Sequence, residues 1–389
     1  MKNLSSVPAD ARCIRPGAAW RLFAALITAL LLSPWPAGTQ PVGNIELIEL
    51  TIREAHQAML AGTLTSRELV VAYLDRINAF DKRGPAFNAI IMTNPRALAR
   101  ADELDTALQR TGAPTGPLHG IPFIVKDNYD TWDMPMTGGS ASLEGSMPAD
   151  DAYQVRKIRE AGAIVLAKSN LAEFAFTETA DPEMLIRFTE AIEDLRRAGA
   201  IVTGDFLIPN LDSLRRGPGC SRFRYDIDTY LASVPNPPVH CLQEIEEGGR
   251  VHVTVMPRVR NFLQFEGTPD TNEGCIQACK NEELLREGVR AAMAEYNVEA
   301  LVYPTWNNPP RLVGDLSNPH GNNSPILSPP TGFPAITVLM GFVWDDTLPA
   351  GLQIYGDAWS EPLLIRIAYT YGQVTNHRRP PKTAPPLEG

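Results

Sequence analysis

The 389-residue sequence lacks the patterns that mark metalloproteins, nucleic-acid-binding proteins and serine esterases. Its six histidines are dispersed and form no zinc-type spacing with cysteine, so we expect no metal and no other cofactor. A formal charge of −10, with 35 basic residues against 45 acidic ones, argues against a nucleic-acid partner. No Gly-x-Ser-x-Gly elbow occurs, which weakens an esterase assignment. The remaining composition, 44% hydrophobic and 21% charged, is that of a globular protein.

The N-terminal apolar run, residues 22–32, is too short to cross a bilayer as a helix. It follows Arg12, Arg15 and Arg21 and precedes a stretch rich in proline and small residues. This pattern predicts a signal peptide over residues 1–38, a secreted protein and no stable membrane span. An uncleaved N-terminal membrane anchor is the alternative.

Cysteine is scarce, with five in the whole chain. Removing the signal peptide would leave Cys220, Cys241, Cys275 and Cys279, an even number that allows one or two disulfides. Scattered buried thiols are the alternative. In a secreted protein, Asn322 would be a glycosylation acceptor, because Ser324 lies two residues after it.

Two helices are predicted between residues 50 and 80 by paired start signals. Thr51 precedes Glu54 by three residues, and Thr65 precedes Glu68 by three, as a capping box requires. A third helix is predicted to open near Asn94.

A strand, a helix and a second strand are predicted next, at residues 121–125, 151–160 and 163–167. This order predicts a parallel crossover unit, and hence an α/β fold with a mixed sheet flanked by helices. The first strand ends on Lys126, which places an amine where open α/β sheets bind ligands.

The C-terminal half predicts further helices and strands. The helices are expected at residues 183–198, 282–296 and from 360 onward, and the strands at 201–208, 300–303, 335–342 and 351–355. Residues 217–249 are proline-rich and low in periodicity, which predicts an irregular surface excursion with a small helix at 225–232.

Three consecutive stretches resemble the amidase signature family, especially its fungal and bacterial amidases. They read GPLHGIPFIVKDN, TGGSASLEGSMPADDA and VRKIREAGAIVLAKSNLAEFAF, and the later ALVYPT, TGFPAITV and GLQIYGDAWSEPLLIRIAYTY are also similar to family segments. The resemblance implies amide hydrolysis by a nucleophilic serine, a second serine after a cis peptide bond, and a lysine. Lys126 falls at the position of the family lysine.

The family segments that carry the two serines do not follow Phe176. A Gly-Ser-Ser-Gly loop and a Gly-Gly-Ser-Ile-Arg stretch are both absent, and residues 177–182 run directly into the helix predicted at 183–198. The sequence therefore predicts a truncated amidase-signature fold, a single domain over residues 39–389 that lacks its catalytic middle at a junction near 177–185.

Two interpretations of Lys126 follow. In the family mechanism it would be a buried, uncharged base with a lowered pKa. Without serines to serve, it could instead form a structural ion pair with Asp127 or Asp130. A substitute nucleophile is conceivable at Ser140 or at Ser142, since Gly138 and Gly139 would allow backbone amides to converge on an anion or substrate.

Three functional hypotheses remain open. The chain is an inactive or severely impaired amidase homologue, or a functional amidase that uses a substitute serine or is encoded by a longer transcript, or a relic that binds small amide ligands. Losing central strands should also leave the strand at Ala163 facing either water or a rearranged partner strand. An exposed apolar edge would predict poor solubility or self-association.

Overall fold

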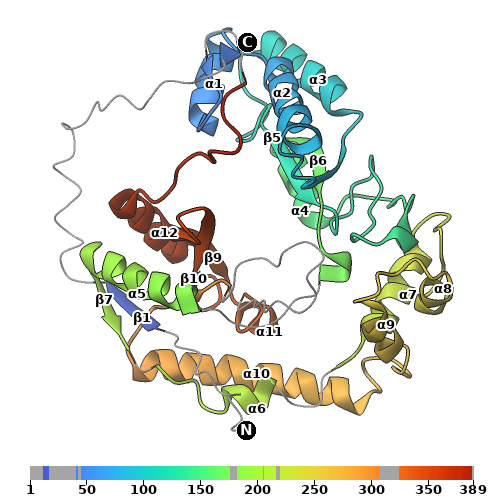
Figure 1. Cartoon of the computed structure of the whole chain (residues 1–389), viewed down its shortest axis with the longest axis vertical. Coiled ribbons are helices and arrows are strands. Elements are labelled where there is room, and N and C mark those ends of the chain that lie inside the picture. The colour runs from blue at the N-terminus through green and yellow to red at the C-terminus, as the bar shows by residue number, and fades with distance from the viewer. Residues whose placement is uncertain are drawn as a thin grey trace. The chain divides into compact units, whose positions relative to one another are not determined.

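The structure, a computed structural model, describes residues 12–16, 41–42, 45–175, 182–204, 206–215, 220–306 and 324–387. The chain forms an α/β fold that divides into two compact units (Figure 1). Unit 1 comprises Met1–Leu32, Thr177–Ser221 and Gly267–Arg379, and unit 2 comprises Ser33–Phe176, Arg222–Glu266 and Pro380–Gly389. The predicted α/β class is confirmed, whereas the assignment of one domain to residues 39–389 stays a prediction.

Unit 2 begins with short strands and helices that lead to a three-stranded sheet. Its elements up to Phe176 are β2 (Pro41–Val42), β3 (Ile45–Glu46), α1 (Ile52–Leu60), α2 (Ser66–Arg76) with its π-helical continuation Ile77–Lys82, β4 (Ile90–Thr93), α3 (Ala97–Thr111), β5 (Pro122–Lys126), α4 (Tyr153–Glu160) and β6 (Ile164–Ser169). The 3₁₀ turns Ala141–Leu143 and Glu173–Ala175 complete this part. Strands β5 and β6 pair in parallel across α4, which confirms the predicted crossover unit.

Strand β6 lies in the middle of this sheet, in the order β4-β6-β5. Of the two outcomes expected for the strand at Ala163, the water-exposed edge is wrong, because β4 pairs antiparallel with β6 on the side opposite β5. Five of the six residues of β6 are buried. Among the described residues β5 is a terminal strand of the sheet, and its outer edge pairs with no other strand.

Capping boxes start both early helices, as the sequence predicts. Thr51 and Glu54 form one at α1, and Thr65 and Glu68 form the other at α2. Each box satisfies backbone amides that the first helical turn leaves without partners. Helices α2 and α3 then bury an apolar cluster against β6, with Val70, Ala97, Ala101, Leu104, Ile164 and Leu166 among its members.

The rest of unit 2 includes a small helical layer with its own apolar core. It consists of α7 (Phe223–Ser233), α8 (Leu242–Glu247) and α9 (Met256–Phe262). Leu231, Leu242, Ile245 and Val259 are fully buried in it, together with Leu143 from the loop after β5. The small helix predicted near 225–232 is confirmed. The prediction of an irregular surface excursion is wrong, because these helices share a buried apolar cluster. The sequence did not indicate this, since loops separate the apolar residues and no helical period results.

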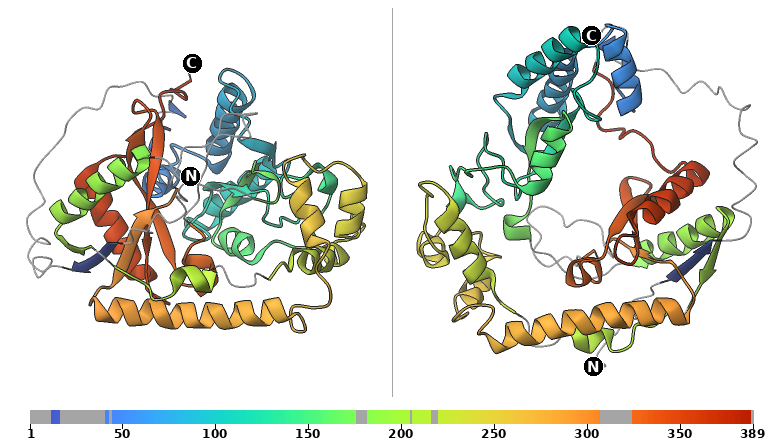
Figure 2. Two further views of the ribbon diagram at one scale, coloured as in Figure 1. Left: turned by 60° about the horizontal axis from the view of Figure 1, so that its bottom comes forward. Right: turned by 180° about the vertical axis from the view of Figure 1, so that it is seen from behind.

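Unit 1 contains a five-stranded sheet in the order β7-β1-β8-β10-β9, in which neighbouring strands are antiparallel. Its elements are β1 (Arg12–Pro16), α5 (Pro182–Arg197), β7 (Ala200–Thr203), α6 (Leu211–Arg215), α10 (Glu273–Glu295), β8 (Ala300–Pro304), α11 (Ser328–Thr331), β9 (Ala335–Val343), β10 (Leu348–Tyr355) and α12 (Glu361–Thr375). Helices α5 and α12 pack on one face of the sheet and α10 packs on the other (Figure 2).

A disulfide joins Cys220 to Cys275 at the first turn of α10, within unit 1. Cys279 and Cys241 are free thiols, the former exposed and the latter half-buried. Of the two disulfides that the sequence allows, the structure thus forms one. Asn322, the predicted glycosylation acceptor, lies outside the described residues.

Candidate functional site

Lys126 ends β5, at the carboxyl end of a parallel strand as the sequence predicts, but its side chain is exposed. The expectation that it is buried is wrong. Side chains alternate between the two faces of a strand, so Val125 points into the core while Ile124 and Lys126 share the opposite face. Ile124 is 49% exposed, which shows that this face of β5 is open to solvent.

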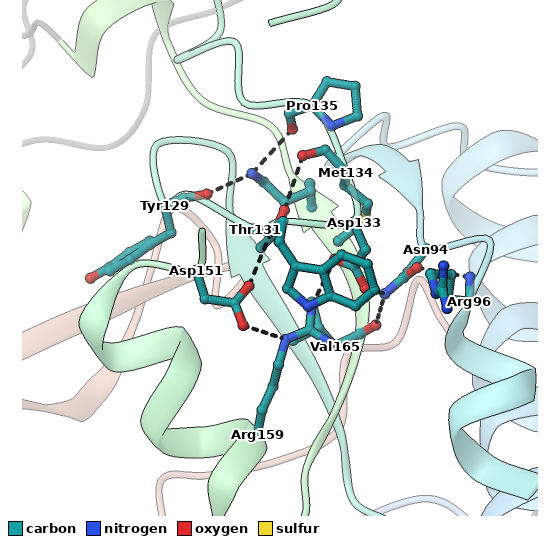
Figure 3. Close-up of polar contacts among 12 residues, drawn as sticks. Asn94, Arg96, Tyr129, Thr131, Asp133, Met134, Pro135, Asp151, Arg159 and Val165 are labelled. Atoms are coloured by element: carbon teal, nitrogen blue, oxygen red, sulfur yellow. Dashed lines mark hydrogen bonds and ion pairs between the residues drawn. The ribbon is translucent and has the colours of Figure 1, made fainter. Parts of the chain in front are cut away.

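The buried amine in this region belongs to Lys168, which lies on the central strand β6. Lys168 is fully buried, and its Nζ lies 3.2 Å from Asp127 Oδ1. The amine also donates hydrogen bonds to the carbonyl oxygens of Tyr129, at 2.7 Å, and Pro135, at 3.3 Å (Figure 3). Burial lowers the pKa of Lys168, and the charge of Asp127 opposes this shift.

The predicted ion pair of Lys126 with Asp127 or Asp130 is also wrong. The fully buried Asp127 pairs with Lys168 instead, and it accepts hydrogen bonds from the backbone amide and the hydroxyl of Thr137. Asp130 accepts a 2.9 Å hydrogen bond from the hydroxyl of Tyr230 on α7. No ion pair or side-chain hydrogen bond of Lys126 occurs within the described part of the chain.

Asp130 is a half-buried carboxyl group. Burial raises the pKa of Asp130, while the hydrogen bond from Tyr230 and the charge of Lys168 act in the opposite direction. The same desolvation, together with the Asp130 charge, raises the pKa of the Tyr230 phenol. The loop after β5 therefore places the carboxylates of Asp127, Asp130 and Asp133 around the buried amine of Lys168, and each carboxylate has a polar partner.

The loop of Gly138, Gly139 and Ser140 uses its backbone amides internally. The Gly138 amide donates to the carbonyl of Asp127 at 3.0 Å, and the amides of Gly139 and Ser140 donate to the hydroxyl and carbonyl of Thr137. Gly139 has a φ of +73°, and a Cβ there would lie 2.7 Å from the carbonyl oxygen of Leu171. The loop is thus a compact turn rather than an open anion-binding nest.

Ser140 forms a hydrogen bond with a glutamate side chain. Its side chain is 2% exposed, and its hydroxyl donates a 2.6 Å hydrogen bond to Glu173 Oε1. The other Glu173 oxygen accepts from the backbone amide of His252 at 2.8 Å. An ionised carboxylate that accepts the serine proton as a hydrogen bond can hold the hydroxyl in place, so Ser140 ties its loop to the segment before α9.

Ser142 follows in the 3₁₀ turn and is also buried. Its backbone amide donates to Ser140 Oγ at 3.2 Å. Its hydroxyl has no hydrogen-bond partner among the described atoms. A serine nucleophile needs a base within hydrogen-bond reach and access to the substrate. Ser142 has no such base. Ser140 has the carboxylate of Glu173 within reach, but its side chain is only 2% exposed, which closes it to a substrate.

A second charged group supports this loop from the side of α4. Arg159 forms ion pairs with Asp133, at 2.7 Å, and Asp151, at 3.1 Å. Asn94 donates 2.9 Å and 2.8 Å hydrogen bonds to Asp133 and to the carbonyl of Val165, which links the loop to β6 (Figure 3). Sequence reasoning missed this network, because its members lie far apart in the chain and no local motif joins them.

Within the described residues, no group of three or more histidine, cysteine, aspartate or glutamate side chains is arranged to hold a metal ion. None of the helices in the described part of the chain combines the length and the apolarity that a membrane-spanning helix requires.

The sequence matches the model of the Amidase family over residues 68–200 and 175–365. The chain belongs to the amidase family. The matched blocks include Lys126, Lys168 and the Gly138–Gly139–Ser140 loop. They overlap between residues 175 and 200, a range that contains the junction predicted from the sequence.

The sequence of this chain aligns with only part of the length of its amidase relatives. An amidase of Schizosaccharomyces pombe is 45% identical over 133 residues, which cover 34% of this chain and 22% of the relative. A glutamyl-tRNA(Gln) amidotransferase polypeptide of Corynebacterium glutamicum is 44% identical over 132 residues, or 33% of this chain and 26% of the relative. The chain thus matches about a quarter of the length of these relatives.

Solved amidase structures match over a longer stretch. The peptide amidase from Stenotrophomonas maltophilia has a TM-score of 0.71 and 25% identity, over 86% of this chain and 99% of the other. An amidase family protein from Bacillus anthracis has a TM-score of 0.70 and 19% identity, over 86% of this chain and 93% of the other, a likeness of fold alone. These structures and this chain share an α/β architecture.

Proposed function

We propose that this chain is an amidase homologue, a carbon–nitrogen hydrolase by ancestry, that is inactive or severely impaired as an amidase. The observation that carries the proposal is the environment of Lys126. Its amine is exposed and has no side-chain hydrogen bond within the described part of the chain. A lysine base requires desolvation to lose its proton near neutral pH and a hydroxyl within reach to deprotonate.

An amidase assay tests this proposal. The purified full-length protein and its Lys126→Ala variant would be incubated with simple aromatic and aliphatic amides. The expected result is release of amine or ammonia at the rate of buffer alone for both proteins. Turnover by the wild type that the Lys126→Ala substitution abolishes would overturn the proposal.

A functional enzyme is the first alternative. It requires either a substitute serine or a longer transcript that supplies the missing segments. The meeting of the two family matches at residues 175–200 supports a break at the predicted junction. The burial of Ser140, which is 2% exposed, argues against a substitute serine there. Labelling by an electrophilic serine probe that Ser140→Ala abolishes would favour it.

A binding relic is the second alternative. The chain would keep affinity for small amides without cleaving them. Isothermal titration with the amides of the assay distinguishes this alternative from the first, because heat of binding without product formation supports a relic. The absence of both binding heat and product would support the inactive homologue.

We also propose that the protein is exported. The signal-peptide pattern of residues 1–38 supports this, and the Cys220–Cys275 disulfide suits an oxidising compartment. Strand β1 lies inside the predicted signal peptide and pairs with both β7 and β8. Cleavage would remove this strand, so its pairing favours an uncleaved, membrane-anchored N-terminus as the alternative. N-terminal sequencing of the exported protein distinguishes the two.

We propose further that the chain self-associates through β5. As a terminal strand with an exposed Ile124, β5 offers unpaired backbone groups and an apolar side chain to a second copy. Gel filtration with light scattering at several protein concentrations tests this, and a monomer at every concentration would contradict it.

A further inference from the structure

Three cysteines lie together at the start of α10. Cys275 is the third residue of this helix and forms the disulfide with Cys220. Cys279 follows four residues later and is an exposed free thiol. Residues four apart on a helix lie on the same face, with their Cβ atoms about 5 to 6 Å apart. The free thiol therefore lies one helical turn from an existing disulfide.

The disulfide lies at a particular place in the chain. Residues Arg222–Glu266 belong to unit 2, whereas Cys220 and Cys275 belong to the unit 1 segments immediately before and after them. The bond thus joins the point where the chain leaves unit 1 to the point where it returns. The two cysteines are 55 positions apart, and the bond closes the whole α7–α9 layer into one covalent loop.

The two ends of the disulfide differ in their chemistry. Cys275 lies in the first turn of a 23-residue helix, whose cap Asn272 accepts a 3.2 Å hydrogen bond from the Cys275 amide. A helix N-terminus stabilises a thiolate, which makes Cys275 the better leaving group in an exchange reaction. Cys275 is only 2% exposed, so external thiols reach it less readily than they reach Cys279.

We propose that Cys279 is a thiol–disulfide exchange site that moves the covalent loop between two pairings. The Cys279 thiolate attacks the sulfur of Cys220, the Cys220–Cys275 bond breaks, and a Cys220–Cys279 bond forms. Cys275 leaves as a thiolate and takes up a proton from solvent. One disulfide is present before and after the step, so the exchange needs no oxidant or reductant. The second pairing attaches Cys220 one helical turn further along α10.

Disulfide mapping tests this proposal in the full-length protein. The wild type and Cys275→Ser would be incubated at pH 8 in a mixture of reduced and oxidised glutathione, quenched with acid, alkylated, digested and analysed by mass spectrometry. The wild type is expected to give peptides with both Cys220–Cys275 and Cys220–Cys279 links. In Cys275→Ser, Cys220 and Cys279 are both free thiols at the start. Oxidised glutathione supplies the oxidant, and we expect a Cys220–Cys279 disulfide to form, so that both thiols lose their reactivity toward the alkylating reagent together.

Two controls keep the outcome decisive. Cys241→Ser removes a free thiol outside the α10 cluster and should leave both linked peptides unchanged. Cys279→Ser should retain Cys220–Cys275 as the one link. The proposal is overturned if the wild type shows Cys220–Cys275 alone with Cys279 fully alkylated at all times. It is also overturned if Cys275→Ser leaves Cys220 and Cys279 separately alkylated or separately joined to glutathione.

Discussion

Two lysines lie near the ends of neighbouring parallel strands, and their surroundings give them opposite physical roles. Lys168, on the central strand, is fully buried and contacts one carboxylate and two carbonyl oxygens. Lys126, on the terminal strand, is exposed. Position in the sheet, rather than the residue type or the strand end, determines which amine is desolvated.

Substitution of each lysine should therefore affect stability very differently. Lys168→Met leaves the buried Asp127 without its cation, which should lower the free energy of unfolding by about 3 to 5 kcal/mol. Lys126→Ala should change it by less than about 0.5 kcal/mol, as expected for an exposed side chain. Urea unfolding followed by circular dichroism measures both. Equal losses in the two variants would mean that Lys126 is buried in solution.

Asp130 should make the stability depend on pH. Its pKa is raised above the ordinary 3.8 by burial, so the folded state holds this proton more tightly than the unfolded state does. Its contribution to stability is complete below about pH 3.8 and is lost as the pH rises through the raised pKa. Asp130→Asn should therefore gain stability relative to the wild type as the pH increases above about 4.

Urea unfolding at intervals between pH 3 and 8 measures this difference. In Tyr230→Phe the hydrogen bond that lowers the pKa of Asp130 is absent, so this pKa should be higher than in the wild type. The loss of stability with rising pH should therefore extend to higher pH. Parallel stability curves for the wild type and Asp130→Asn would refute the predicted linkage.

At the scale of elements, the five-stranded and the three-stranded sheets differ in how their strands are joined. Strands β5 and β6 are parallel and need the crossover through α4, whereas β9 and β10 form an antiparallel pair joined by a short turn. The layer α7–α9 has no strand to anchor it and depends on its apolar cluster. The Cys220–Cys275 disulfide encloses this layer in a covalent loop. We expect this disulfide to contribute strongly to the stability of the layer.

Removing the disulfide should destabilise the protein strongly. Cys220→Ser opens a loop of 55 positions, for which the chain-entropy model gives about 4 kcal/mol. Urea unfolding of Cys220→Ser, compared with the wild type, measures the loss. Cys241→Ser is the matched control, because it removes a thiol that forms no disulfide. Unchanged stability in Cys220→Ser would show that the bond is absent from the protein in solution.

The open edge of β5 leads to a prediction about assembly. Ile124→Lys places a charge on the exposed edge strand, which is a common means of blocking strand pairing between chains. We expect the dimer fraction in gel filtration with light scattering to fall at least about tenfold, because the charge would be buried in a dimer interface. Ile186→Lys, on the exposed surface of α5, is the control and should leave association unchanged. Equal dimerisation of both variants would place the interface elsewhere.

At the scale of the whole molecule, the question is which residues the mature protein contains. The family match is divided into two blocks that meet at residues 175–200, and the proposal of an impaired amidase places the loss of the family serines there. The chain nevertheless keeps enough of the α/β framework to match a solved amidase over 86% of its length. On this proposal, the chain has lost the catalytic serines of the family but has kept the α/β framework.

The intact mass of the exported protein tests both ends of this proposal. We expect a chain that begins near residue 39 and has no inserted residues at positions 177–185. A larger mass with extra peptides at residues 177–185 would restore the enzyme hypothesis. A mass that includes Arg12–Pro16 would mean that β1 stays in its sheet.

The local elements and the family could be predicted from residues that are neighbours in the chain. Capping boxes, a strand–helix–strand period and contiguous family motifs are properties of neighbouring residues, and the structure confirms the two early helices and the parallel pair. The tertiary structure alone decided which lysine is buried, which acid Ser140 contacts and which strand lies at the edge. Those outcomes depend on segments such as β4 and α7 that lie far away in sequence, and the burial of a charge depends on everything that packs around it.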